Sequence, residues 1–232
     1  MIVVVGEPVF RVPSGTTPGA ASGRSVAIAR AAVADGAAVQ LVGKVGDDPT
    51  ADALLIDLAR AGIGHAAILR DPARRTPTAA TTGDASPIDP EREDAAGDGS
   101  TADEAEAPPR PQLDAADLEL GLRYLPAFGV LVVAEPFAAE ILAVATDAAA
   151  YTGAELVVVA APGGHAATAV GAGATVAGTV LEAPSDSADD PDDRFADLVG
   201  RYAAALDAGT PAGEAFRGAV MSSGWEAAPA DP

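Results

Sequence analysis

Lys44-Val45-Gly46-Asp47-Asp48-Pro49, residues 44–49, is the stretch that decides the fold, because it joins the apolar run Val39 to Val42 to an amphipathic segment. Asp48 followed by Pro49 is typical of a helix N-cap and first helical residue, and Gly62 is typical of a C-terminal cap. The buried face of that helix is expected to consist of Leu54, Leu55 and Leu58. The pattern predicts a strand, a short turn and a helix.

Strands and helices alternate along the rest of the chain. Val3 to Val5 is a continuous apolar run that ends at Gly6, which favours a buried parallel strand. Helical spacing and apolar runs predict further helices and strands at Ser25 to Gly36, Asp114 to Leu125, Val130 to Ala134, Ala138 to Tyr151, Leu156 to Ala160, Phe195 to Leu206 and from Thr210-Pro211. This alternation predicts an α/β fold, a doubly wound α/β/α sandwich with a mostly parallel sheet, in a single domain over residues 1–232.

Two other segments depart from this alternation. Residues 83–111 contain Asp, Glu, Pro, Gly, Ser and Ala with hardly an apolar side chain, so we expect a disordered acidic insertion. Ala166 to Val170 and Thr175 to Leu181 flank Gly171-Ala172-Gly173, and they are expected to form a hairpin.

Composition excludes several classes of function. A formal net charge of −20 disfavours both a nucleic-acid partner and an anionic membrane surface. The chain has no cysteine, which excludes disulfides and thiol catalysis, and no apolar run is long enough to span a membrane. The N-terminus has no basic segment typical of a signal peptide, so we expect a cytoplasmic location.

Several segments occur in the order found in one enzyme family. They are Val3-Val4-Val5-Gly6-Glu7, Ser25 to Gly36, residues 44–49, Thr76-Pro77-Thr78, Val157 to Ala166 and Phe195 to Gly209. Together they resemble the ribokinase-like, or PfkB, carbohydrate kinases over most of the chain except roughly residues 79–110. The resemblance implies transfer of phosphate from ATP, with Mg²⁺, to a hydroxyl of a small sugar or nucleoside. One βα unit of the family pattern is missing after Ala134, and the substrate-covering lid is expected to be reduced or absent, which makes a lid-based dimer doubtful.

The resemblance also implies substrate-binding positions, and most of them are altered. Arg11 stands where the family has an Asp that accepts hydrogen bonds from substrate hydroxyls, so an acceptor has become a donor. The family's Gly-Gly-x-x-x-Asn loop corresponds to Ala20, Ala21 and Ser25; Ser25 either bonds a hydroxyl or, as the favoured alternative, caps the following helix. Lys44, Gly46 and Asp47 are retained and are predicted on the substrate side.

The family's Gly-Ala-Gly-Asp sequence, which cradles phosphate and supplies a catalytic base before the last long helix, is replaced by an acidic run. Counting back from Phe195 makes Asp193 the base and places Asp190 at a glycine position that faces the nucleotide, whereas counting forward from Asp186 makes Asp192 the base. Pro191 removes one backbone donor in either register. A solvated acidic helix terminus and a divalent metal site made of these carboxylates are the alternatives, and we predict no metal site.

Other candidates are weaker. Gly163 and Gly164 match the family's nucleotide-binding turn, but a lone pair of glycines is not specific. His65 and His165 lie next to glycines and are expected in surface turns. The sequence predicts a catalytically impaired carbohydrate-kinase homologue with a binding or regulatory role; an active ATP-dependent sugar or nucleoside kinase and a protein-interaction module that uses the acidic segment are the alternatives.

Overall fold

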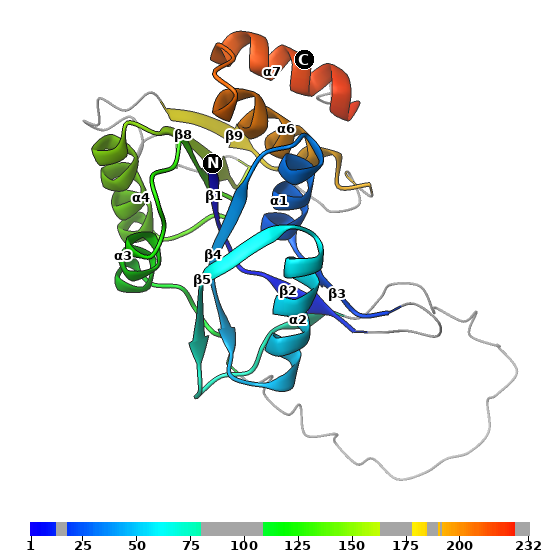
Figure 1. Cartoon of the computed structure of the whole chain (residues 1–232), viewed down its shortest axis with the longest axis vertical. Helices are drawn as coiled ribbons and strands as arrows, with labels where there is room; N and C mark the ends of the chain where they lie inside the picture. The colour runs from blue at the N-terminus through cyan, green and yellow to red at the C-terminus, as the bar shows by residue number, and fades with distance from the viewer. Residues whose placement is uncertain (13–17, 80–108, 163–177, 185–189, 191, 226–232) are drawn as a thin grey trace, which may run out of the picture.

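A computed structural model describes residues 1–12, 18–79, 109–162, 178–184, 190 and 192–225. Its main feature is a six-stranded parallel sheet with the strand order β5-β4-β1-β7-β8-β9. The strands are β1 (Ile2–Val5), β4 (Val39–Gly46), β5 (Ile63–Asp71), β7 (Val130–Val133), β8 (Glu155–Ala160) and β9 (Gly178–Glu182). The predicted α/β class and parallel sheet are confirmed (Figure 1).

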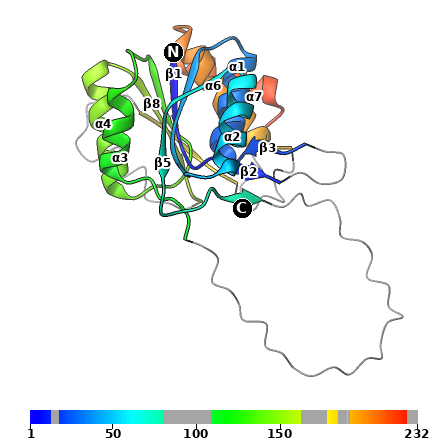
Figure 2. The same ribbon diagram turned by 60° about the horizontal axis from the view of Figure 1, so that its bottom comes forward.

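Helices cover both faces of this sheet, as Figures 1 and 2 show from two directions. On one face lie α1 (Arg24–Ala34), α2 (Pro49–Arg60), α6 (Arg194–Asp207) and α7 (Ala212–Ser223), and on the other lie α3 (Ala115–Arg123) and α4 (Ala139–Thr152). Alternate residues of β1 enter the two cores: Ile2 and Val4 pack towards α1 and α6, and Val3 and Val5 pack towards α3 and α4. All four side chains are fully buried, as expected for a central parallel strand.

The helix predicted from the opening stretch forms as expected. Asp48 is the N-cap of α2 and its side chain accepts a hydrogen bond from the backbone N–H of Ala51, while Pro49 is the first helical residue. The same carboxylate accepts hydrogen bonds from the backbone N–H and the hydroxyl of Thr76, both at 2.8 Å. Asp48 therefore ties the start of α2 to the segment that follows β5.

A second, three-stranded sheet lies beyond the carboxyl end of β1 and projects from the body of the molecule (Figure 2). It consists of β2 (Val9–Arg11), β3 (Ala20–Ser22) and β6 (Thr78–Ala79). β2 pairs antiparallel with β3 and parallel with β6. The prediction of a reduced lid is consistent with this small sheet.

Some local predictions were wrong. β4 continues to Gly46, beyond the predicted end at Val42, because its parallel pairing with β5 extends to Asp71. His65 lies within strand β5 and not in a turn. β9 pairs parallel with β8; the other arm of the predicted hairpin, and His165, lie outside the described residues.

The predicted acidic insertion lies mostly outside the described residues, which resume at Pro109, and Pro111 at its predicted end is buried. Among the helices that the structure describes, none combines the length and the apolar composition needed to cross a membrane.

Candidate functional site

The carboxyl ends of β1 and β7 form the point where the order of strands along the sheet reverses. From β1 the chain proceeds outwards to β4 and β5, and it later returns to the other side of β1 with β7, β8 and β9. In open α/β sheets, ligands bind in the crevice at such a switch point. Gly6 and Glu135 are the residues that lie at this position, shortly after the two strands end.

Glu135 is the acidic group at the centre of the site. Its Oε1 accepts the backbone N–H of Ser25 in the first turn of α1 at 3.3 Å, and its Oε2 accepts the backbone N–H of Glu7 at 3.3 Å. A Cβ on Gly6 would overlap Oε2 of Glu135, so the glycine allows the carboxylate to pack against the main chain. The arrangement joins the ends of β1 and β7 to the start of α1.

The environment of Glu135 makes protonation easier. The residue keeps partial contact with solvent, but protein atoms pack closely around its carboxyl group. This desolvation raises the pKa of Glu135 from 4.5 to about 7, against the lowering effect of the hydrogen bonds from Ser25 and Glu7 and of the nearby charge of Arg24. A carboxyl group with a pKa near neutrality at a switch point is typical of a functional site.

Ser25 does not cap α1, contrary to the favoured prediction. The N-cap position is Gly23, with φ of 99°, a left-handed conformation that favours glycine, and Ser25 lies inside the first turn. The Ser25 side chain is fully buried, and its Oγ has no hydrogen-bond partner among the described residues. The role of Ser25 in binding substrate stays a prediction. The residue lies buried beside Glu135.

The start of α6 is the second part of the site. Asp190 Oδ1 accepts the backbone N–H of Arg194 at 2.7 Å, and Oδ2 accepts that of Phe195 at 2.9 Å. These N–H groups belong to the first turn of the helix, where an anion would otherwise bind. The carboxylate of Asp190 therefore occupies the position of a bound anion, and the described residues do not fit a nucleotide phosphate there.

The two candidates for the catalytic base differ in their surroundings. Asp192 forms an ion pair with Arg194 at 3.0 Å. Asp193 is the N-cap residue of α6 in a left-handed conformation, φ 53°, and its side chain makes no capping hydrogen bond. A cavity of about 150 Å³ lies beside Asp193, and its lining consists of Arg24, Pro184, Asp190, Asp193, Phe195 and Ala196.

The predicted substrate-side positions on β2 and β3 lie in the small sheet. Arg11 is exposed at the end of β2, where its backbone pairs with Ala20 of β3, and Ala21 is buried. Arg11 and Ala21 both belong to the small sheet, whereas Lys44 and Gly46 belong to β4 of the main sheet.

Lys44, Gly46 and Asp47 are engaged in contacts within the protein. Lys44 Nζ donates to Asp117 of α3 at 2.7 Å, and this hydrogen bond, opposed by partial burial, raises the lysine pKa. The N–H of Gly46 donates to Thr76 Oγ1 at 3.1 Å, and Asp47 pairs with Arg70 at 3.1 Å. In this structure the three residues hold β4, α3 and β5 together.

Glu135 is the residue that sequence reasoning missed. Its only local signal is a charged residue directly after the apolar run that ends at Ala134, in the stretch Ala134-Glu135-Pro136. Gly163 and Gly164 lie outside the described residues. In the part of the chain that the structure describes, no group of three or more His, Cys, Asp or Glu side chains is arranged to hold a metal ion.

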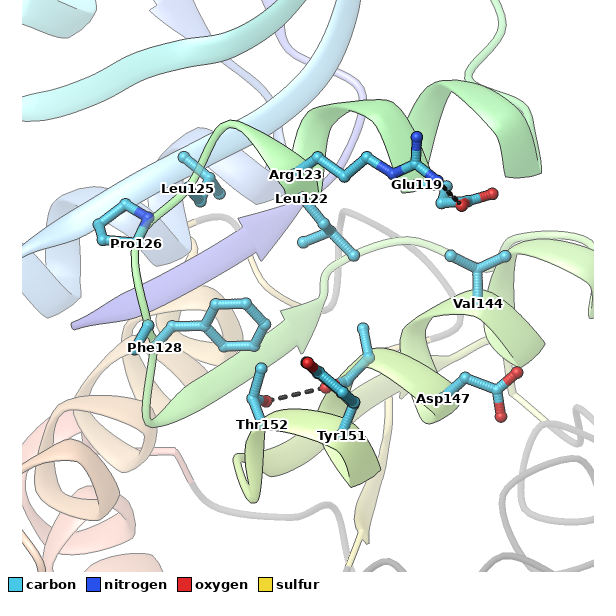
Figure 3. Close-up of a pocket in the computed structure, with 12 residues that line it drawn as sticks. Glu119, Leu122, Arg123, Leu125, Pro126, Phe128, Val144, Asp147, Tyr151 and Thr152 are labelled. Atoms are coloured by element: carbon cyan, nitrogen blue, oxygen red, sulfur yellow. Dashed lines mark hydrogen bonds and ion pairs between the residues drawn. The ribbon is translucent and has the colours of Figure 1, made fainter.

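A larger cavity of about 910 Å³ lies between α3 and α4, at the end of the sheet opposite the switch point (Figure 3). Phe128, just before β7, and Thr152, just before β8, both line it, which places it at the amino ends of the strands. Leu122 and Val144 point into it from the two helices, and Tyr151 at its rim is 93% exposed. This cavity is separate from the switch point.

No protein-family model and no curated protein sequence matches the chain. Solved structures do. An Arabidopsis thaliana ribokinase complexed with ribose and ATP is 13% identical, with a TM-score of 0.58 over 96% of this chain and 90% of that one. A carbohydrate kinase from Agrobacterium tumefaciens is 14% identical, with a TM-score of 0.56 over 96% and 89% of the two chains. The similarity spans nearly the whole of each molecule, so the chain has the ribokinase-like fold of carbohydrate kinases.

Proposed function

We propose that this protein is a ribokinase-like carbohydrate-kinase homologue that binds a small hydroxyl-bearing ligand at the switch point and is impaired in phosphoryl transfer. The observation that carries the proposal is the pair of hydrogen bonds from Arg194 and Phe195 to Asp190. A phosphate that approached α6 would have to displace this carboxylate or bear its repulsion. Loss of one oxyanion-binding donor typically costs on the order of 3 kcal/mol in a transition state.

The class of ligand follows from the groups at the two strand ends. Glu135 supplies carboxylate oxygens, which accept hydrogen bonds from hydroxyl groups, and it keeps partial contact with solvent. Arg24 lies close enough to Glu135 to lower its pKa, and its guanidinium donates hydrogen bonds. The mixture of acceptors and donors suits an uncharged polyol such as a sugar or a nucleoside, and the ribose bound by the Arabidopsis relative supports this class.

One observation favours the second candidate, an active kinase that uses ATP and Mg²⁺. Asp193 makes no side-chain capping bond and lines the cavity at the start of α6, so its carboxylate is available to accept a proton from a substrate hydroxyl. The pairing of Asp192 with Arg194 favours Asp193 over Asp192 for this role.

The test is ligand-dependent thermal unfolding together with a transfer assay. We expect ribose or a related sugar or nucleoside at millimolar concentration to raise the unfolding midpoint and Mg-ATP to leave it unchanged. A ligand at 100 times its dissociation constant stabilises by about 2.7 kcal/mol, which is easily measured. Sugar-dependent ADP release that disappears in Asp193→Asn would overturn the impairment and establish the active kinase.

A control separates ligand binding at the switch point from the impairment of phosphoryl transfer. Glu135→Ala should abolish the shift caused by the sugar, whereas Asp47→Asn, at an exposed ion pair away from the switch point, should retain it. If no sugar or nucleoside shifts the midpoint of the wild type, the ligand class is wrong, whatever the result with ATP.

A further inference from the structure

The cavity between α3 and α4 has the size and the lining of a site for a small organic molecule. Its volume is about 910 Å³, and ligand sites in proteins typically range from about 300 to about 1,000 Å³. Phe128 is buried in its wall, and the apolar side chains of Leu122, Leu125, Val144 and Ala148 are half-buried there. An apolar body placed in the cavity would remove this surface from water, which favours binding.

The rim on α4 carries an aromatic ring and a carboxylate as neighbours. Tyr151 follows Asp147 by four residues, so both side chains lie on one face of the helix and both line the cavity (Figure 3). Tyr151 is 93% exposed and takes part in neither of the aromatic ring contacts found among the described residues. Asp147 is also exposed, and in the described part of the chain its carboxylate has no hydrogen-bond or ion-pair partner. The contacts of the fold therefore leave both groups available to a ligand.

The charges of the lining favour a cation. On the opposite rim, Arg123 of α3 donates to Glu119 at 2.6 Å, so these two charges balance each other within one helix. Asp147 is then the charge of the lining that no described residue compensates. The formal net charge of the chain, −20, also attracts cations and repels anions at longer range. A carboxylate beside an aromatic face suits an ammonium group, which forms an ion pair with the first and a cation–π contact with the second.

We propose that the cavity between α3 and α4 binds a small organic amine with an apolar, ring-containing body. The body packs against Phe128 and Val144, and the ammonium group lies between the carboxylate of Asp147 and the ring of Tyr151. Phe128 precedes β7 and Glu135 follows it, so this site and the switch point lie at opposite ends of one strand. The two sites share no residue, and the amine site does not depend on which ligand the switch point binds.

Three probes with the same naphthyl body separate the effect of charge from that of shape. Naphthylethylamine, naphthylethanol and naphthylpropanoate are titrated into the full chain at neutral pH and low salt. Nuclear magnetic resonance follows the methyl groups of Leu122 and Val144, with Leu54 in the core on the other face of the sheet as the reference. We expect the amine to shift the two cavity methyls saturably and to bind at least about 5-fold more tightly than the propanoate, with the alcohol in between. Added salt should reduce this preference. Equal affinities of amine and propanoate, or no shift of the cavity methyls with the amine, would overturn the proposal.

Two exposed substitutions and two matched controls locate the ammonium group. Asp147→Asn should reduce the preference for the amine over the propanoate to less than about 2-fold, and Tyr151→Ala should weaken binding of the amine more than that of the alcohol. Glu140→Gln removes an exposed carboxylate from the same helix, and Tyr124→Ala removes an exposed tyrosine at the end of α3; neither side chain lines the cavity. Both controls should keep the wild-type preference.

The controls also give the result that would refute the site. A preference that is unchanged in Asp147→Asn, or that falls equally in Glu140→Gln, would assign the selectivity to the overall negative charge of the chain. All four variants should retain the response to sugar proposed for the switch point, so failure of one site is distinguishable from failure of the other.

Discussion

The carboxylate of Asp190 accepts the backbone N–H of Phe195 at 2.9 Å, five residues further along the chain. Its other oxygen accepts the N–H of Arg194. The helix therefore carries its own anion at the end where the partial positive charge of its dipole lies. The Asp190 carboxylate therefore occupies the place at this helix terminus where an external anion would bind.

We expect Asp190→Gly to lower the stability of the protein and to allow an anion to bind at the start of α6. Loss of the capping bonds should lower the free energy of unfolding by about 1 kcal/mol. The freed N–H groups should allow Mg-ADP to raise the unfolding midpoint, whereas we expect no such effect in the wild type. Asp192→Gly is the matched control, because it also removes a carboxylate but contacts the Arg194 side chain and not the helix backbone. Equal responses of the two variants to Mg-ADP would contradict the assignment.

The Asp48 carboxylate should contribute to stability in a pH-dependent way. Burial opposes its ionisation, but hydrogen bonds from Thr76 and Ala51 outweigh burial and lower its pKa below 3.8. Its contribution is therefore present above the ordinary pKa of aspartate and is lost as the pH falls through the lower value in the folded state. Asp48→Ala should cost about 2–3 kcal/mol at neutral pH, measured by urea unfolding. The cost should shrink at about pH 3, and a constant cost would show that packing alone is responsible.

Two helical glycines should respond to alanine in opposite directions. A Cβ on Gly200 would lie 2.5 Å from the carbonyl oxygen of Ile28, where α6 crosses α1, whereas a Cβ on Gly218 of α7 meets nothing within 4 Å. Gly200→Ala should destabilise by about 1–3 kcal/mol through overpacking. Gly218→Ala should stabilise by up to about 1 kcal/mol through helix propensity. A stable Gly200→Ala protein would mean that the two helices can separate at no cost.

The Lys44–Asp117 pair should be structural. The two side chains are 19% and 18% exposed, so water screens their 2.7 Å contact only in part. A double-mutant cycle with Lys44→Met and Asp117→Asn should give a coupling of about 1 kcal/mol in unfolding free energy. The raised pKa of Lys44 means that this contribution is present below pH 10.5 and declines only as the pH rises above that value. Lys44→Met should leave sugar binding unchanged; loss of binding would return Lys44 to the site.

Replacement of Glu135 by glutamine should change the pH dependence of global stability. Because its pKa is raised in the folded protein, the neutral form is favoured below the ordinary pKa of glutamate, and this stability is lost as the pH rises through about 7. Glu135→Gln should therefore unfold at a higher temperature than the wild type at about pH 8, and the difference should shrink towards about pH 5. A constant difference between the two proteins would point to a change in packing.

Local sequence signals predicted the helices well because their determinants lie within a few residues. Asp48 and Pro49 define the start of α2 as predicted, and the helix predicted from Asp114 forms as α3, with Asp114 as its N-cap. The strand β5 was not predicted, because an edge strand with half-exposed residues such as His65 has no clean alternation. β2 and β3 were not predicted either, because their pairing depends on contacts that the local sequence does not specify.

The site was less predictable than the fold for a related reason. The role of Glu135 follows from its position beside Gly6, and the two residues become neighbours only when β7 is placed next to β1. The capping by Asp190 depends on the conformation of the residues between it and α6, which composition alone leaves open. Both contacts depend on tertiary structure. The acidic run itself is visible in the sequence, and its conflict with phosphate stays a prediction.

The strand order of the main sheet also has a consequence for synthesis of the chain on the ribosome. β1 is completed on one side by β4 early in the chain, but its other edge pairs with β7, which begins only at Val130. A nascent chain that ends before this point carries the apolar strand Ile2–Val5 with an open edge, the kind of edge that pairs with other chains. Productive folding of the amino-terminal half must therefore wait for the carboxyl-terminal half, and truncated fragments are expected to need a chaperone to stay in solution.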